Sequence, residues 1–503
     1  MATYVNDLRL KEIATGDESG TWGTSTNTNL ELIGEAFGSG SEALSDASTA
    51  TITMADGASD AARAMSLTLT GSLSQACTVT LAPNTVNKCW IIQNSAGDTV
   101  TISQGSGANV VIPNGGIKMI VTDGAGSGAA VTDVLDLTGG TGNIGLGSGA
   151  LGVGLTTGTD NVAIGENAGD ALTTGSNNTA LGDKALSANT TADDNTAIGA
   201  DALILNSTGA SNVAVGKDTL EANTTASNNT AVGMAAMQAN TTGASNTAVG
   251  TYSLDANTTA SNNTAVGYAS LTANTVGASN VAVGYGALDA NTTASGNTGV
   301  GFDALGANTT GAYNVALGST ALDAATTANS NTAVGHNSLG AATTGGGNTA
   351  LGRDSLKSNT TGTNNVSVGN AALDANTTGA ENTAVGTSAL GANTTASYNT
   401  AVGQGAGDAI TTGNYNTAIG RSALTALTTN AANTAVGGTA LAANTAANNT
   451  AVGYAALAAN TTGTKNVAVG NLSGDANTEG GENVAIGYDA LTTDTKGSHS
   501  VAV

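Results

Sequence analysis

The sequence predicts an all-β protein: a parallel β-solenoid (β-roll) of about 21 coils with a 17-residue period, preceded by a small β-sandwich-like domain. One observation behind this is a motif, N-[TV]-A-[VI]-G, that returns every 17 residues through 141–503, as at 449–453 and 466–470. Another is a set of short β-branched runs, bounded by turn residues, in 45–140. Hydrophobic residues make up 40 % of the chain, too many for disorder, and aromatic residues only 3 %, which suits a thin core.

Residues 1–44 are expected to form a polar leader with one short helix. The stretch TWGTSTNTNLELIGEAF, residues 21–37, contains a turn followed by a helical pattern, and Asn27 or Asn29 is placed to cap that helix. Trp22 is the one large residue before it. The predicted apolar stripe of the helix consists of Leu30, Ile33 and Phe37.

Residues 45–140 are expected to form the small all-β domain. Its predicted strands are SLTLTGSL, CTVTLAP, CWIIQN, DTVTISQ, ANVVIPN and IKMIVTDG, at spacings typical of a sandwich or barrel. Trp90 is expected to fill the core. For Cys77 and Cys89 we expect two reduced, buried thiols, with a disulfide as the alternative, and two thiols are too few ligands for a metal.

Residues 141–503 are the repeat array. Seventeen residues suit one solenoid coil with two short strands, each bonded to its copies in the coils above and below. A column of asparagines would stack its side-chain amides along the array, and a column of glycines would form a corner where φ is positive or a Cβ has no room. The first members of these columns are Asn161, Asn178, Asn195, Asn212 and Asn229, and Gly165, Gly182, Gly199, Gly216 and Gly233.

The two predicted strands of each coil differ in their surroundings. In the first, no repeat has a charge at the three positions between Asn and Gly, so both of its faces should be buried. In the second, Leu and Ala should point inward, while the residue between them is often polar and meets water, as at Glu221, Asp255 and Lys357. The uncharged strip needs a cover, and other copies of the chain around a shared axis supply one; we expect a homotrimeric fibre.

The motif N-[TV]-A-[VI]-G resembles the head repeat of trimeric autotransporter adhesins, which implies a trimeric parallel β-roll over 141–503. TWG (21–23) with TNTNL (26–30) is similar to a segment of tailed-phage fibre and virion proteins, and residues 95–124 resemble phage fibre modules. This second resemblance implies a virion fibre whose N-terminus docks on the virion and whose array projects toward a host surface glycan or a capping protein. The residues it implies for attachment are Trp22, Asn27, Asn29 and Leu30. A bacterial surface adhesin is the alternative.

Charge and composition argue against other roles. The net charge of −24 disfavours nucleic acid and anionic membranes as partners. No apolar run reaches 18 residues and the N-terminus lacks a secretory pattern, so we expect a chain made in a host cytoplasm and carried in the virion. His336 and His499 lie in separate repeats, and we find neither a carboxylate pair suited to catalysis nor a calcium-loop pattern. We therefore expect no enzyme activity, no metal and no cofactor.

Two binding roles remain as alternatives. Paired threonines such as Thr190-Thr191 and Thr224-Thr225 could order ice, but neighbours on a strand face opposite ways, so we expect them to line a turn and bond the backbone. Corner aromatics could stack on glycans, although they are scattered and should form no continuous track. These aromatic candidates are Tyr268, Tyr285, Phe302, Tyr313 and Tyr454.

Irregular repeats and the last residues raise two further expectations. Gly169, Gly407 and Gly474 replace the inward Leu, and Leu172 and Ile410 are candidates to fill the space in the first two repeats. The sequence stops inside a coil at Val503. Because an open solenoid end exposes unpaired strand groups, we expect a further protein or a swapped chain to cover it and to carry receptor specificity.

Overall fold

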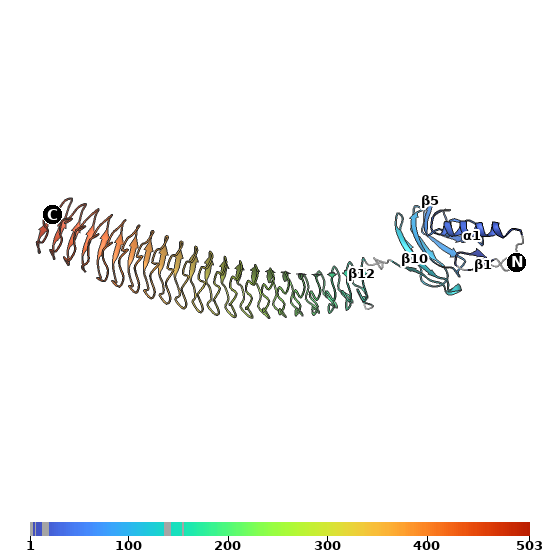
Figure 1. The fold of residues 1–503 in the computed structure, drawn as a ribbon, viewed down its shortest axis with the longest axis horizontal. Helices are drawn as coiled ribbons and strands as arrows, with labels where there is room; N and C mark the ends of the chain where they lie inside the picture. Colours follow the sequence, from blue (N-terminus) through green and yellow to red (C-terminus); the bar gives the residue numbers. More distant parts are fainter. Residues whose placement is uncertain (1–3, 6, 13–19, 135–141, 153–154) are drawn as a thin grey trace. The chain divides into compact units, whose positions relative to one another are not determined.

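The computed structural model describes residues 4–5, 7–12, 20–134, 142–152 and 155–503, and separates into two compact units, Met1–Gly139 and Gly140–Val503. Figure 1 shows a helix and a group of strands in the first unit and a succession of coils in the second. The division falls where the repeat pattern begins.

The first unit contains one α-helix, two short 3-10 helices and eleven strands in its described part. In order, these elements are β1 (Tyr4–Val5), β2 (Leu10–Lys11), α1 (Trp22–Ala36), β3 (Ser39–Leu44), β4 (Thr49–Thr53), η1 (Ala61–Arg63), β5 (Ser66–Gly71), β6 (Cys77–Ala82), β7 (Asn87–Ser95), β8 (Val100–Ser103), β9 (Val110–Ile112), β10 (Ile117–Asp123), η2 (Gly126–Gly128) and β11 (Val131–Asp133).

Strands β3 to β8 alternate between two sheets. β3, β5 and β7 pair in parallel in one sheet, and β4, β6 and β8 pair in parallel in the other. β9, β10 and β11 then add antiparallel pairs. The chain thus returns to the same sheet at every second strand, an arrangement closer to a short coil than to a set of hairpins, and the predicted sandwich is not confirmed.

All six predicted strands are present, as β5 to β10. The strands β1 to β4 and β11 were not predicted. β3 lies in the segment assigned to the leader, yet it pairs with β5 along its whole length, from Ser39 to Leu44. Its sequence, SGSEAL, has little apolar character, so the hydrophobic pattern gave no signal for it.

One hydrophobic core joins the two sheets. Leu69 and Ile92 enter it from one sheet, and Val79 and Ile102 from the other, all four without solvent exposure. Trp90 is 2 % exposed, and its indole N–H donates to the carbonyl of residue 62 at 2.9 Å. The prediction that Trp90 fills this core is confirmed, and the hydrogen bond satisfies its one polar group.

Two basic side chains hold the η1 loop in place. Lys88 donates to three successive backbone carbonyls, those of residues 62–64. Burial lowers the pKa of Lys88 to about 8. Arg63 is fully buried and donates to the backbone carbonyls of Leu8 and Ala55. These cations satisfy buried carbonyls that would otherwise lack donors.

Helix α1 begins earlier than predicted and turns a different side inward. It starts at Trp22, so neither Asn27 nor Asn29 caps it, and the preceding Thr21 makes no side-chain cap. Asn29 instead exchanges hydrogen bonds of 3.1 and 3.2 Å with the Lys11 backbone. The helix residues that are buried are Leu32 and Ala36, whereas Leu30 and Phe37 of the predicted stripe are exposed and Ile33 is half-buried. Asn29, Leu32 and Ala36 lie on one helix face, and the bond to β2 turns that face inward.

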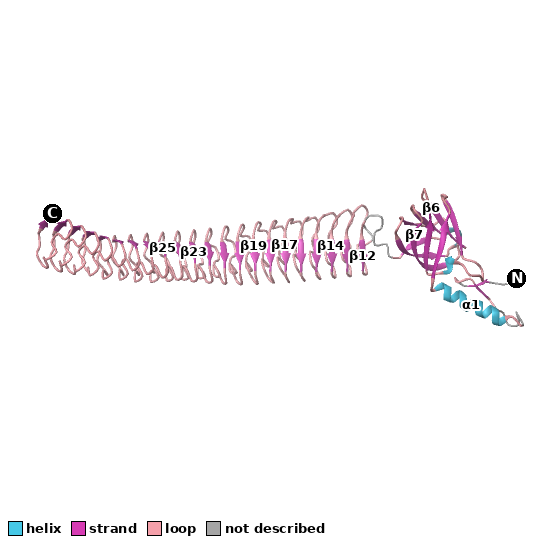
Figure 2. Cartoon of the chain, turned by 90° about the horizontal axis from the view of Figure 1, so that it is seen from above, coloured by secondary structure: helices cyan, strands magenta, loops and turns pink. Residues whose placement is uncertain are grey.

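The second unit is built on one parallel sheet of 22 strands, β12 to β33 (Figure 2). Each strand pairs in register with its copies in neighbouring coils, as Ala180 does with Ala163 and Ala197. The strands are β12 (Ile144–Leu146), β13 (Val162–Ile164), β14 (Thr179–Leu181), β15 (Thr196–Ile198), β16 (Val213–Val215), β17 (Thr230–Val232), β18 (Thr247–Val249), β19 (Thr264–Val266), β20 (Val281–Val283), β21 (Thr298–Val300), β22 (Val315–Leu317), β23 (Thr332–Val334), β24 (Thr349–Leu351), β25 (Val366–Val368), β26 (Thr383–Val385), β27 (Thr400–Val402), β28 (Thr417–Ile419), β29 (Thr434–Val436), β30 (Thr450–Val452), β31 (Val467–Val469), β32 (Val484–Ile486) and β33 (Val501–Ala502).

Each coil has one strand rather than the two predicted. The second predicted strand, around the Leu of each repeat, is a series of turns, because the backbone takes positive φ at Leu and two residues before it. In one coil Asp201 has φ of 58° and Leu203 has φ of 53°. Left-handed backbone cannot continue a strand. The inward partner of Leu203 is the adjacent Ala202, and both are fully buried.

The motif glycines occupy corners where two coils approach closely. Gly182 has φ of 135°, and a Cβ on it would lie 2.6 Å from the carbonyl carbon and oxygen of the next motif glycine. The other glycines predicted for this column have φ between 133° and 137° and the same close approach; they are Gly165, Gly199, Gly216 and Gly233. The glycine column therefore combines positive φ with a lack of room for a Cβ, the two reasons for which glycine was expected there.

Gly182→Ala should destabilise the array by about 3 kcal/mol, because the added Cβ would meet backbone that cannot move aside. Gly306→Ala is the matched control, since Gly306 has no positive φ and the nearest atom to its Cβ would lie at 3.4 Å. Thermal unfolding followed by circular dichroism compares the two variants. An equal loss from both would contradict the role assigned to the corner.

Candidate functional site

The asparagine that opens each motif points into the coil and joins it to the next. The Oδ1 of Asn161 accepts the backbone N–H of Asn178 at 2.9 Å and its side-chain amide at 3.0 Å. The Nδ2 of Asn178 also donates to the carbonyl of Ala192 at 2.9 Å. Asn195, Asn212 and Asn229 continue the same backbone bond at 3.0 Å. The ladder is thus present, with the backbone as its most regular partner.

A second column of buried asparagines was missed by the sequence analysis. The run begins at Asn206, and each later member donates from Nδ2 to the Oδ1 of the one before, at 2.8 to 3.1 Å; these later members are Asn223, Asn240, Asn257, Asn274, Asn291 and Asn308. The two columns meet at one carbonyl in each coil: the Gly243 oxygen accepts from Asn229 at 2.9 Å and from Asn240 at 3.0 Å. The signal was the Asn before each threonine pair, which recurs with the same period.

Two alanines interrupt this second column. Ala325 and Ala342 take the place of asparagine in successive coils, and both are fully buried. The Oδ1 of Asn308, in the coil before them, is buried and has no hydrogen-bond partner in the described structure. An unpaired buried acceptor of this kind costs about 1–3 kcal/mol. The interruption is therefore a weak point in the array.

The threonine pairs line a turn, as predicted. In most pairs the first hydroxyl donates to a backbone carbonyl of the next coil, as Thr224 does to Thr241 at 3.2 Å and Thr309 to Thr326 at 3.0 Å. The second member, such as Thr225, is exposed. One exposed threonine per coil lacks the Thr-x-Thr spacing on which the ice-binding interpretation of these pairs depended.

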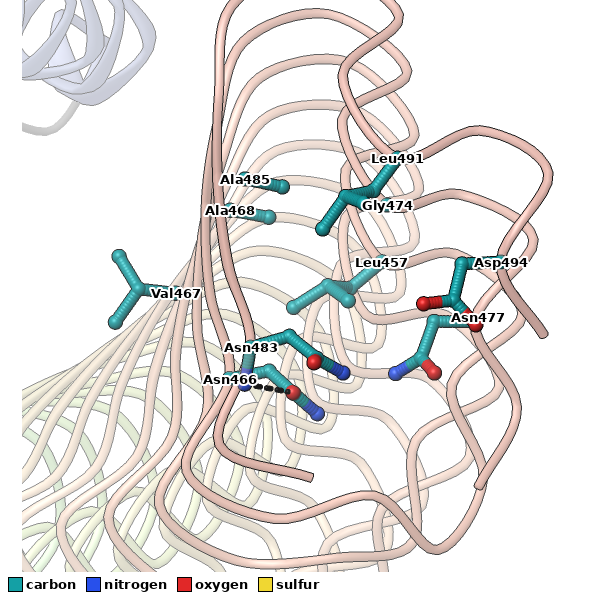
Figure 3. Close-up of a pocket in the computed structure, with 10 residues that line it drawn as sticks. All are labelled: Leu457, Asn466, Val467, Ala468, Gly474, Asn477, Asn483, Ala485, Leu491 and Asp494. Atoms are coloured by element: carbon teal, nitrogen blue, oxygen red, sulfur yellow. Dashed lines mark hydrogen bonds between the residues drawn. The ribbon is translucent and has the colours of Figure 1, made fainter. Parts of the chain in front are cut away.

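The outer flank of the sheet is uncharged along its length. From β13 to β32 the middle residue of each strand is buried, while its two neighbours are partly or fully exposed. Figure 3 shows this alternation near the end of the array, where Val467 points away from the coil and Ala468 into it. Leu317 is 48 % exposed and Leu351 47 %. The three-residue strand of each coil was predicted to be buried on both faces. In a single chain its inner face is buried and its outer face is exposed to solvent.

Aromatic residues form two stacks, one on each border of this flank. Tyr268, Tyr285 and Phe302 follow the motif glycine in successive coils and stack with ring centres 5.5 Å apart and planes within 13°. Tyr398 and Tyr415 precede the motif asparagine and stack at 4.9 Å. Tyr252, which the sequence analysis did not select, meets Tyr268 edge-on at 6.1 Å.

The prediction that the rings form no continuous track is wrong for the successive coils of the first stack. The three rings of the first stack follow one another at the period of the array, a signal present in the sequence. Tyr313 and Tyr454 belong to neither stack among the described residues, although both are exposed. Stacked rings cover one another's faces, and these are the surfaces that a sugar needs, so the geometry does not favour glycan stacking.

The irregular glycines occupy the left-handed position of the missing Leu. Gly169 and Gly407 have φ of 57° and 59°. Leu172 and Ile410 fill the space, as predicted, since a Cβ on either glycine would lie 3.0 Å from a methyl group of that side chain. The apolar side chain has moved to the second asparagine column, and the strained backbone position has passed to glycine.

Gly474 lacks this replacement. Asn477 stands where Leu172 and Ile410 stand in the other two repeats, and a small cavity remains between coils, lined by residues that include Leu457 and Leu491 (Figure 3). The cavity lies inside the array and offers no polar group beyond those of the asparagine columns and Asp494.

The attachment candidates lie in and beside α1. Trp22 is 65 % exposed and Leu30 61 %, and Asn27 is also exposed, whereas Asn29 is engaged with Lys11. All of them belong to the first unit, whereas the aromatic candidates belong to the array.

The cysteines and histidines form no joint site in the described ranges. Cys77 and Cys89 are free thiols; Cys77 is buried, and burial raises its pKa, while Cys89 is half-buried rather than buried as expected. His499 Nε2 lies 3.1 Å from the Glu482 carboxylate, and His336 belongs to another coil. No three His, Cys, Asp or Glu side chains of the described residues gather in a way that could hold a metal.

Comparisons of the chain with protein-family models, with curated proteins and with solved structures find no match. Within the described ranges, no helix combines the length and the apolar character needed to cross a bilayer.

Four aspartates in the turn column have raised pKa values. Burial raises the pKa of Asp255, Asp289, Asp323 and Asp374, because desolvation disfavours the charged carboxylate. The Asp255 Oδ1 is buried and has no hydrogen-bond partner in the described structure. The expectation that this column simply meets water is therefore only partly right.

Completing the second asparagine column should stabilise the array. Ala325→Asn combined with Ala342→Asn gives Asn308 a donor and continues the ladder to Asn359, for an expected gain of about 1–2 kcal/mol. Asn240→Ala is the opposite change within an unbroken stretch and should cost about 2–3 kcal/mol, because it leaves buried partners unpaired. Chemical denaturation of the unaltered protein, the double variant and Asn240→Ala measures both changes in the free energy of unfolding. A loss of stability in the double variant would contradict this prediction, because it would show that the coils at 325 and 342 pack too closely around alanine to admit asparagine.

The aspartate column should make the array more stable as the pH falls from neutral. A carboxyl with a raised folded-state pKa binds its proton more readily when folded, so stability rises as pH falls through that pKa and levels off near the unfolded value of about 4. Replacing the four aspartates by asparagine should raise the thermal midpoint at pH 7 by roughly 2 °C or more and change it little at pH 4.

Asp354→Asn is the contrasting control for this measurement. Arg353 lowers the pKa of Asp354, so that carboxylate stabilises the fold at neutral pH and loses its contribution on acidification. This variant should lower the midpoint at pH 7. Midpoints that move together in the two variants would contradict the assignment.

Proposed function

We propose that this protein is the fibre of a tailed phage: a non-enzymatic rod of three chains that joins the virion to the host surface. The first unit attaches to a virion protein, and the array extends toward the host, where its far end contacts a surface glycan or a capping protein. Its action is mechanical, because it holds two surfaces at a set distance. At roughly 4.8 Å per coil, the array of about 21 coils is on the order of 100 Å long.

The uncharged outer flank of the sheet is the observation that carries this proposal. A continuous, partly exposed and uncharged surface of Thr, Val, Ile and Leu side chains running through β13 to β32 is typical of an interface. A partner that fills it must follow the same rise per coil along its whole length. A second copy of the chain has that rise, and a closed ring of copies covers every flank.

The bonding between coils supports a role as a rigid spacer. A parallel strand, two asparagine columns and a threonine hydroxyl all link one coil to the next. Bending the array would stretch several of these bonds at every level. A chain bonded in this way keeps its length under load better than a flexible linker.

The exposed side of α1 supports attachment through the first unit. Trp22, Leu30 and Phe37 recur at helical spacing and are 61–74 % exposed, while the opposite side is buried. This is the segment that resembles virion proteins. A large apolar stripe of this kind suits docking on another protein.

Two alternatives keep specific support. The motif resemblance to adhesin heads favours a bacterial surface adhesin with the same roll. The outer flank itself presents Thr-x-Val in many coils, such as Thr247 and Val249, a flat ranked surface that suits ice binding in a monomer. The state of association separates the ice-binding alternative from the fibre.

In solution the protein should have three times the chain mass of 48.0 kDa and should form rods visible by electron microscopy. Val266→Asp with Val283→Asp, on the outer flank, should yield folded monomers, because association would bury unpaired charges. Val276→Asp is the control, since Val276 is 51 % exposed but lies outside the flank. Light scattering after size exclusion gives the masses. A monomer of unaltered sequence would overturn the fibre, and thermal hysteresis in that monomer would favour ice binding.

A further inference from the structure

The flank proposed as the interface does not by itself say how copies align along the axis. Its strands repeat almost the same three residues, so a shift of one coil places Thr or Val of one copy where an equivalent Thr or Val stood before. No charge on the flank would be misplaced by such a shift. Register is weakly specified in strands that repeat without distinguishing side chains. A fibre of defined length needs features that break this repeat.

The stacked rings break the repeat of the flank residues, and they lie on the two borders of the flank. Tyr285 is separated from the flank residue Val283 by the motif glycine alone. Tyr415 is separated from the flank residue Thr417 by the motif asparagine alone. We call the column after the motif glycine the first rim and the column before the motif asparagine the second rim. The three-residue strands make the flank only about 10 Å wide, so both rims are close to any copy that covers it.

We propose that the ring stacks on the two rims fix the axial register in which copies of the chain associate. This inference rests on the proposed association through the flank. When flat faces gather around one axis, they meet along their long edges, so the first rim of one copy lies beside the second rim of the next. The rings are 47–63 % exposed in the single chain, which leaves surface for such a contact.

The residues opposite the first stack fit this arrangement. Across the strands that precede Tyr268, Tyr285 and Phe302, the second-rim residues are Asn262, Ser279 and Gly296, none of which is aromatic. Copies aligned level with one another therefore place each ring of the first stack beside a residue without a ring. A shift of one coil would bring the second-rim ring Tyr313 to the level of Phe302 in place of Gly296, so misaligned copies meet ring against ring. The second stack, Tyr398 and Tyr415, marks a distant level of the array on the other rim.

Charges on the rims are poorer candidates for this task. On the second rim Lys465 and His499 both contact Glu482 within the chain, at 3.0 and 3.1 Å. These groups are paired already and are exposed, so salt screens what they add between copies. Rings contribute contact area that depends on position and not on ionic strength.

Disulfide mapping between co-expressed chains tests the register. One chain carries T332C and the other T349C, which occupy the same flank column one coil apart. Aligned copies should form T332C–T332C and T349C–T349C bonds, and mixed bonds should stay rare, because the extra rise of one coil takes the pair beyond disulfide reach of about 7 Å. Peptide mass spectrometry identifies each bond and accounts for Cys77 and Cys89.

Replacing the stacks by serine, as Y268S/Y285S/F302S with Y398S/Y415S, should raise the mixed share at least about fivefold while the mass stays that of the full assembly. The control removes exposed threonines outside the rims, T225S/T242S/T259S, and should leave the mixed share low. An unchanged mixed share in the ring variant would overturn the proposal. Dissociation of the ring variant would overturn it too, because the rings would then supply affinity rather than alignment. If the T332C and T349C chains with intact rings formed no bond between copies, association through the flank would be refuted instead.

Discussion

The asparagine amide inside each coil is the interaction on which the array depends. A coil of 17 residues contains only three residues of strand, so most of its backbone lies in turns whose polar groups face the interior. Buried peptide groups without partners would cost more than the small core returns. Two asparagines per coil, such as Asn229 and Asn240, supply donors to one inward carbonyl, Gly243, and pass a third bond to the neighbouring coil. The interior is therefore held by amides as much as by alanine and leucine.

This way of bonding explains why the rest of the repeat is so uniform. The amides reach the next coil only if coils approach closely, and the motif glycines permit that approach because a Cβ on them would meet the next backbone. The turns that aim the asparagines inward require left-handed backbone at residues such as Leu203 and Ser211, each a strain of about 1 kcal/mol. Where glycine takes the left-handed position, as at Gly169, the apolar side chain shifts to Leu172 and the core stays filled.

The sequence contained the period, the asparagine and glycine columns and the uncharged flank, because each recurs at one spacing with one residue type. It did not reveal that the second half of the coil is turns, since inward Leu beside polar residues imitates the alternation of a strand. It placed a helix in residues 21–37 but not the inward side of α1, which follows from the long-range bonds of Asn29 to Lys11. The ring stack of Tyr268, Tyr285 and Phe302 was within reach, because their spacing equals the period and in-register pairing places such residues side by side.

Different interactions act inside and outside the array: hydrogen bonds within the chain close each coil, and side-chain contacts on the flank are left for association. Backbone groups are satisfied within the chain, so a coil can close without a partner, and what remains for association is a surface of side chains alone. Such a surface repeats at every coil, so its Thr and Val side chains make equivalent contacts at any level. Alignment must then come from residues that depart from the repeat. A few aromatic residues interrupt the repeated threonines and serines. These irregular positions are able to give a long, uniform interface a single axial register.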